Sequence, residues 1–114
     1  MEAGIANTTG LANTFVGVDA GRANTTGRSN IFIGVKAGPA NTTGEFNTFL
    51  GTNSGEANTE GNANTFIGEN AGLATTTGTN NTFLGGRAGA TNVTGSYLIA
   101  VSYTHLTLPT ILLV

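Results

Sequence analysis

A period of 17 residues runs through most of the chain and constrains its fold more than any other feature. The consensus N-T-F-(I/V/L)-G-x-x-A-G-x-A-N-T-T-G-x-x continues without insertion or deletion from about residue 2 to residue 97. Three columns of equivalent positions that follow this period are Asn13, Asn30, Asn47, Asn64 and Asn81; Phe15, Phe32, Phe49, Phe66 and Phe83; and Gly17, Gly34, Gly51, Gly68 and Gly85. A repeat this regular predicts identical units stacked in one direction.

The positions of glycine and threonine indicate which unit is stacked. Glycine occurs three times in each period, which argues against helices and coiled coils. The consensus suits an all-β fold, a parallel β-solenoid or β-roll with 17-residue rungs. We expect two short strands per rung, N-T-F-(I/V/L) and A-N-T-T, each closed by a turn in which glycine adopts a positive φ. The Asn of the first strand should hydrogen-bond to its counterparts in the rungs above and below.

The Phe column and the Ile/Val/Leu column occupy adjacent positions. Adjacent residues of a strand point to opposite faces, so one column should form an apolar stripe along the outside of the rod. Exposed stripes of this kind mark interfaces. The pattern therefore predicts that the solenoid packs laterally on identical stripes of other chains. The alternative is a lone solenoid whose kinked corners turn both columns inward.

Composition excludes several classes of function. The net charge is −2 and only 9% of the residues are charged, so the basic surface of a nucleic-acid-binding protein is missing. Without cysteine, neither a disulfide framework nor a thiolate metal site can form. The six carboxylates lie at different phases of the repeat and the one histidine, His105, lies outside it. We therefore expect no enzyme, no metal site and no cofactor.

The chain divides into a repeat region, residues 1–97, and an apolar tail, residues 98–114, which has no Gly and no Asn. Residues 101–110 look like a translated sequencing adapter, so we expect the tail to be an artefact. The alternatives are a genuine cap over the last rung or a docking strand. The tail is too short, and too polar in its middle, for membrane insertion. Glu2 already stands in mid-period, which predicts a fragment of a longer fibre.

Four stretches of the repeat carry a resemblance to known proteins: residues 30–34, 41–44, 47–51 and 71–72. They resemble the NTFLG-x-x-AG-x-x-NTTG repeats of bacterial and phage surface fibre proteins, arrays that often precede an intramolecular chaperone of the endosialidase type. They are more loosely similar to the head repeats of trimeric autotransporter adhesins, which form left-handed parallel β-rolls. The 17-residue period and the doubled Thr depart from the autotransporter pattern.

The resemblance implies a homotrimeric module, a stalk or head, of an extracellular, cell-surface or virion-surface fibre, with a role in adhesion or as a spacer. A host-surface or glycan receptor, if there is one, would meet the variable corner columns. Two other functions stay open. Unpaired edges at the two ends of the solenoid would support a self-assembling filament. The Thr columns would suit an ice-binding β-solenoid, although two parallel outward Thr ranks are not expected from the A-N-T-T segment.

Overall fold

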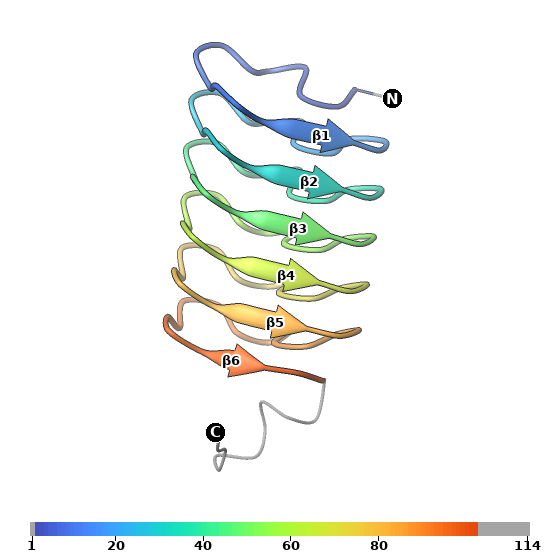
Figure 1. Cartoon of the computed structure of the whole chain (residues 1–114), viewed down its shortest axis with the longest axis vertical. Coiled ribbons are helices and arrows are strands. Elements are labelled where there is room, and N and C mark those ends of the chain that lie inside the picture. The colour runs from blue at the N-terminus through green and yellow to red at the C-terminus, as the bar shows by residue number, and fades with distance from the viewer. Residues whose placement is uncertain (1, 103–114) are drawn as a thin grey trace.

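The computed structural model describes residues 2–102 and is a parallel β-solenoid (Figure 1). Each rung contributes one strand to a single sheet, and the strands are β1 (Thr14–Val16), β2 (Ile31–Ile33), β3 (Thr48–Leu50), β4 (Thr65–Ile67), β5 (Thr82–Leu84) and β6 (Ile99–Ala100). They pair in sequence order, and Phe32 lies opposite Phe15 and Phe49, so the register advances by one 17-residue period per rung. The predicted fold class is confirmed.

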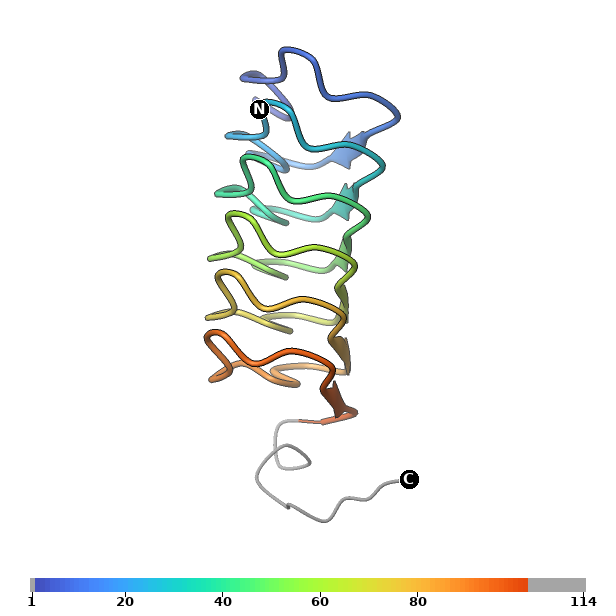
Figure 2. The same cartoon turned by 90° about the vertical axis from the view of Figure 1, so that its left-hand side faces the viewer.

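The prediction of a second strand in each rung is wrong. In the A-N-T-T segment of the second rung, the N–H groups of Thr25, Thr26 and Gly27 all donate to the carbonyl oxygen of Thr42, at 3.1, 3.3 and 3.2 Å. Three consecutive N–H groups converge on one atom only where the chain bends, because successive N–H groups of a strand point in opposite directions. The sheet therefore covers one side of the rod, and turns complete each rung (Figure 2).

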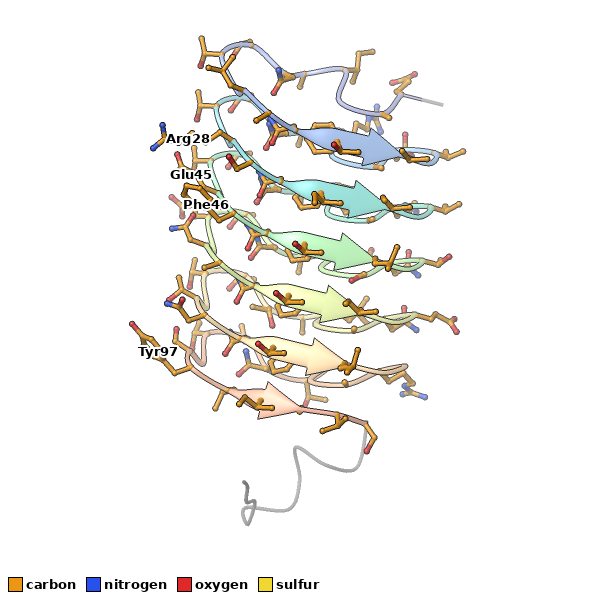
Figure 3. All side chains as sticks on the ribbon, viewed as in Figure 1. Arg28, Glu45, Phe46 and Tyr97 are labelled. Carbon is orange, nitrogen blue, oxygen red and sulfur yellow. The ribbon has the colours of Figure 1, made fainter. Side chains whose placement is uncertain are left out.

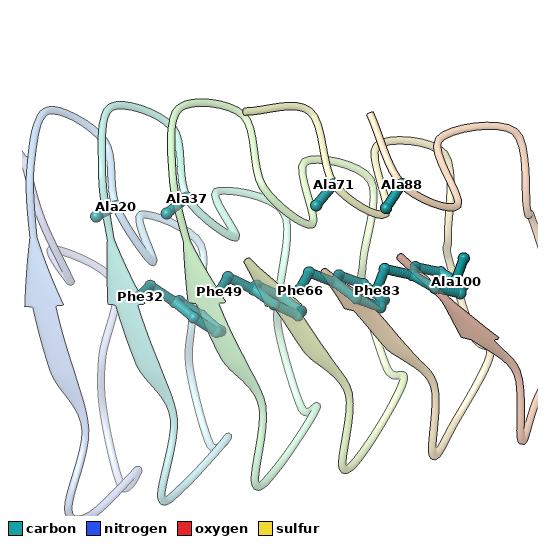
Figure 4. Packing of buried hydrophobic residues seen from close by; sticks show 9 residues of the cluster. All are labelled: Ala20, Phe32, Ala37, Phe49, Phe66, Ala71, Phe83, Ala88 and Ala100. Atoms are coloured by element: carbon teal, nitrogen blue, oxygen red, sulfur yellow. The ribbon is translucent and has the colours of Figure 1, made fainter. Parts of the chain in front are cut away.

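The Phe column forms the core. Phe32, Phe49, Phe66 and Phe83 are completely buried, and their rings stack in one line with the alanines of the neighbouring turn beside them (Figure 4). The ring centroids of Phe32 and Phe49 are 4.7 Å apart and their planes differ by 6°. This spacing matches the roughly 4.8 Å between parallel strands, so each ring lies directly over its copy. A thin core suffices because the same contact recurs in every rung.

Buried asparagines connect the rungs in two ways. In the predicted column, the Oδ1 atom of Asn30 accepts the backbone N–H of Asn47 at 2.9 Å, so the side chain bonds to its counterpart through the backbone. A second column, which the sequence analysis did not single out, forms a direct amide ladder. There, the Nδ2 atom of Asn41 donates to Oδ1 of Asn24 and that of Asn58 donates to Oδ1 of Asn41, both at 2.8 Å.

Two of the three glycine columns require glycine for different steric reasons. Gly34, in the predicted column, has a φ of +136°, and a Cβ there would lie 2.6 Å from the carbonyl oxygen of Gly51. Gly44, in the column after A-N-T-T, does not have a positive φ, contrary to the expectation for that turn. A Cβ at Gly44 would instead overlap with Asn41 Oδ1 and with the carbonyl oxygen of Gly61. Close approach of successive rungs, rather than backbone conformation, requires glycine in this column.

The register continues beyond residue 97. The Leu98 N–H donates to Asn81 Oδ1 at 2.9 Å, the bond that the backbone N–H of Asn makes at this position in the earlier rungs. Ile99 and Ala100 form β6 opposite Thr82 and Phe83. Residues 103–114 lie outside the described part of the chain, so the predictions for His105 and for most of the adapter-like run 101–110 fall outside it as well.

Candidate functional site

The outer face of the sheet carries an aliphatic rank formed by Val16, Ile33, Leu50, Ile67 and Leu84. Because the Phe column fills the interior, this neighbouring column points outward; Val16 is 54% exposed and Leu50 41%. The prediction of an outward apolar stripe is therefore confirmed, and the alternative with both columns inward is wrong. The strands that carry this stripe are stacked along one side of the rod, with their side chains drawn in Figure 3.

A second rank lies on the same face, two residues earlier in each strand. We call it the strand Thr rank, and its members are Thr14, Ile31, Thr48, Thr65, Thr82 and Ile99. The hydroxyl groups of its four threonines form no hydrogen bond with any residue in the range 2–102. This rank was not predicted from the sequence, although its i, i+2 spacing from the aliphatic column places it on the same face of the strand.

The threonines of the A-N-T-T segment behave differently. The Oγ1 atom of Thr25 donates to the carbonyl oxygen of Thr42 at 3.2 Å, and that of Thr42 donates to the carbonyl oxygen of Thr59 at the same distance. These hydroxyls are part of the contact between rungs. The next column, which includes Thr26 and Thr43, is exposed. As predicted, this segment presents one outward Thr column rather than two.

The corners carry the charged residues. At one corner, Arg28 Nε lies 3.2 Å from Glu45 Oε1, and the Arg28 guanidinium carbon lies 6.0 Å from the ring centroid of Phe46. On another turn, Arg22 Nε lies 3.7 Å from Glu2 Oε1. Beside this second pair is a shallow recess of about 280 Å³, lined by Asp19, Arg22, Lys36, Pro39, Ala40 and Glu56.

The predicted site residues hold the rungs together rather than forming a chemical site. The Phe column is stacked in the interior, the Asn column bonds rung to rung, and the Gly column allows their close approach. Within residues 2–102, no group of three or more His, Cys, Asp or Glu side chains is placed to hold a metal ion. In the same range, no helix has the length and apolarity needed to cross a membrane.

Comparison with protein-family models, with curated proteins and with solved structures finds no match for the chain. The resemblance to surface fibre repeats therefore stays a prediction carried by the repeat motif alone. Two surfaces are left as candidates for function, both defined by the fold: the outer sheet face with its two ranks, and the corner that holds Arg28, Glu45 and Phe46.

Proposed function

We propose that this chain is a structural module, a stalk or head, of an extracellular or virion-surface fibre that serves in adhesion or as a spacer, and that it associates with itself as a homotrimer. The observation that carries the proposal is the aliphatic rank, in which Val16, Leu50 and Leu84 are exposed. The two members between them, Ile33 and Ile67, are half-buried. A rod with a uniform core and one continuous apolar stripe is suited to lateral packing.

The size of the stripe sets the free energy that lateral association can gain. Burying the exposed half of one aliphatic side chain gains about 1 kcal/mol, so the five members of the rank contribute about 5 kcal/mol per chain. Association costs about 4–15 kcal/mol in lost freedom of motion. A parallel trimer buries three stripes around one axis but bears this association cost twice, whereas a dimer buries two stripes and bears it once. The choice of a trimer therefore rests on the resemblance of the repeat to trimeric surface fibres. The same rank repeated along a longer fibre would add further to the free energy gained.

Sedimentation velocity tests the proposal. The wild-type chain should sediment as a trimer at micromolar concentration, and the double variant Leu50→Thr/Leu84→Thr as a monomer, because threonine retains the preference for a strand and removes most of the apolar contact. The matched control is Thr26→Ser/Thr43→Ser, on an exposed turn away from the sheet, which should remain trimeric. Circular dichroism should be the same for all three. A wild-type chain that stays monomeric would refute self-association, and large heterogeneous species would indicate filament growth instead.

Ice binding is the second candidate, and the strand Thr rank favours it. The hydroxyls of Thr48, Thr65 and Thr82 are unbonded within residues 2–102 and repeat once per rung, beside a parallel rank of aliphatic side chains. Such a face presents methyl and hydroxyl groups in register at about 4.8 Å along the rod. If the chain binds ice, the wild type should show thermal hysteresis and Thr65→Lys should lose it. A wild-type chain without thermal hysteresis rules this candidate out.

A further inference from the structure

Phe46 is one of two exposed aromatic residues in a turn column whose other members are small or are Asn; the second is Tyr97. Phe46 is 56% exposed at a corner of the rod, and its backbone has a φ of +59°, in the left-handed region that bulky side chains rarely adopt. The equivalent residues share this conformation, and they are Ala12, Ser29, Ala63, Asn80 and Tyr97. Most of them are small or are Asn, the types that tolerate this conformation or expose little apolar surface.

The fold itself does not require an aromatic ring at this position. The Phe46 N–H donates to the carbonyl oxygen of Arg28 at 3.1 Å, and Ala63 makes the equivalent bond to the carbonyl oxygen of Glu45 at 2.9 Å. The rung therefore needs only the backbone conformation and one N–H group. Because the whole column has this φ, the turn imposes the conformation. What the turn does not account for is a large apolar ring left exposed to solvent at Phe46.

The neighbours of Phe46 give the exposed ring a polar border. The Arg28 guanidinium lies 6.0 Å from the ring centroid, within cation–π range, and its Nε is 3.2 Å from Glu45 Oε1 (Figure 3). The ion pair places a guanidinium and a carboxylate next to the ring. The guanidinium has five N–H donors and the carboxylate about four acceptor positions, so one ion-pair contact leaves most of them available. Ring, donors and acceptors thus form one small site, which we call the Phe46 corner.

We propose that the Phe46 corner binds a sugar in its pyranose form, with the C–H face of the sugar on the phenyl ring and its hydroxyl groups bonded to Arg28 and Glu45. A pyranose has this combination of an apolar face and a hydroxyl edge. Its polarised C–H groups match the negative face of the aromatic ring, its oxygens accept from the guanidinium, and its O–H groups donate to the carboxylate. This inference names a receptor class for the adhesion role proposed above, and rests on it to that extent.

The shape of the corner favours a sugar over a protein partner. The ring projects from a single rung, between rungs that carry Ser29 and Ala63 in the same column. A stable protein interface buries about 1,200–2,000 Å² and needs a wide complementary surface. A convex corner about one rung high, close to 5 Å, has the dimensions of one sugar ring.

An NMR titration with methyl β-D-galactopyranoside tests the inference, since the C3–H, C4–H and C5–H groups of this sugar lie on one ring face. We expect chemical-shift changes confined to the Phe46 ring and amide and to the Arg28 Nε–H, with a millimolar dissociation constant.

Phe46→Asn should weaken binding at least about tenfold while keeping or raising the melting temperature, because Asn tolerates the left-handed conformation. Phe46→Tyr should retain binding. Tyr97→Ala is the matched control: Tyr97 is 79% exposed in the same column, and its loss should leave binding unchanged.

Three results would overturn the inference: the wild-type chain shows no shifts, the shifts centre on Tyr97 or on the sheet face, or Phe46→Asn binds like the wild type. If Phe46→Asn instead changes the sedimentation behaviour, the ring belongs to a contact between chains and the sugar site is wrong. The fibre proposal fails separately, through a monomeric wild-type chain in sedimentation, which leaves the result of the titration unaffected.

Discussion

Replacing Thr75 by Asn should stabilise the solenoid, because it would complete the buried amide ladder. Thr75 stands in the column of Asn24, Asn41 and Asn58, each of which donates its amide to the residue one rung before it. Asn58 Oδ1 consequently has no donor, and within residues 2–102 it is the one buried side-chain N or O atom without a partner. Thr75 instead donates its hydroxyl to the carbonyl oxygen of Asn92 at 3.1 Å.

The magnitude follows from the hydrogen bonds gained and lost. An unsatisfied buried acceptor costs about 1–3 kcal/mol, and Asn at position 75 would place its Nδ2 where two equivalent pairs make 2.8 Å bonds. The bond from the Thr75 hydroxyl to the carbonyl oxygen of Asn92, worth about 0.5–1.5 kcal/mol, is lost. The bond that the same hydroxyl accepts from Asn92 Nδ2 at 3.2 Å passes to the Oδ1 atom of the new Asn. The net gain is about 1 kcal/mol, which raises the melting temperature by about 4–8 °C in a domain of this size.

Thermal and urea unfolding followed by far-UV circular dichroism would measure the difference. Thr77→Asn makes the same chemical change two residues away at an exposed position and should leave the stability within about 0.5 kcal/mol of the wild type. The converse variant, Asn41→Thr, removes the donor to Asn24 Oδ1 and should destabilise by about 1–3 kcal/mol. If Thr75→Asn is no more stable than the wild type while Thr77→Asn is neutral, the unpaired acceptor does not carry the cost assigned to it.

Further predictions concern the core and the tight contacts, each measured as a change in unfolding free energy by urea denaturation. Phe49→Ala should cost about 3–5 kcal/mol, because the Phe49 ring is fully buried. Phe46→Ala should stay within about 0.5 kcal/mol of the wild type. Equal losses for the two variants would refute the stacked core. Gly44→Ala should cost about 1–3 kcal/mol through overlap with the next rung. Gly86→Ala should be neutral, because the nearest atom to a Cβ there is the Glu69 carbonyl oxygen at 4.0 Å. A neutral Gly44→Ala would contradict the close-approach argument. Lys36→Asn should gain up to about 1 kcal/mol, since Lys36 has a φ of +55°, and a loss would show that its side chain stabilises the turn.

The sequence alone was enough to predict the period, the all-β class and the division into an inner and an outer column. The reason is physical: an uninterrupted 17-residue repeat makes equivalent residues stack in register, and alternation along a strand separates Phe49 from Leu50. The exposed apolar stripe followed from the same alternation. The strand Thr rank on that face follows from the same rule, because it lies at i, i+2 spacing from the aliphatic rank.

The tertiary structure decided how the repeated groups meet across rungs. The A-N-T-T segment has the composition of a strand, yet three of its N–H groups converge on the carbonyl oxygen of Thr42, an arrangement that depends on where the next rung lies. The unpaired acceptor at Asn58 likewise appears only when the orientation of Thr75 is known. In the sequence, Phe46 occupies one variable position among others. Only the structure shows that it is exposed, that its φ is positive and that Arg28 lies beside it. Hydrogen-bond direction and side-chain exposure are properties of the stacked rungs, and a one-dimensional repeat does not specify them.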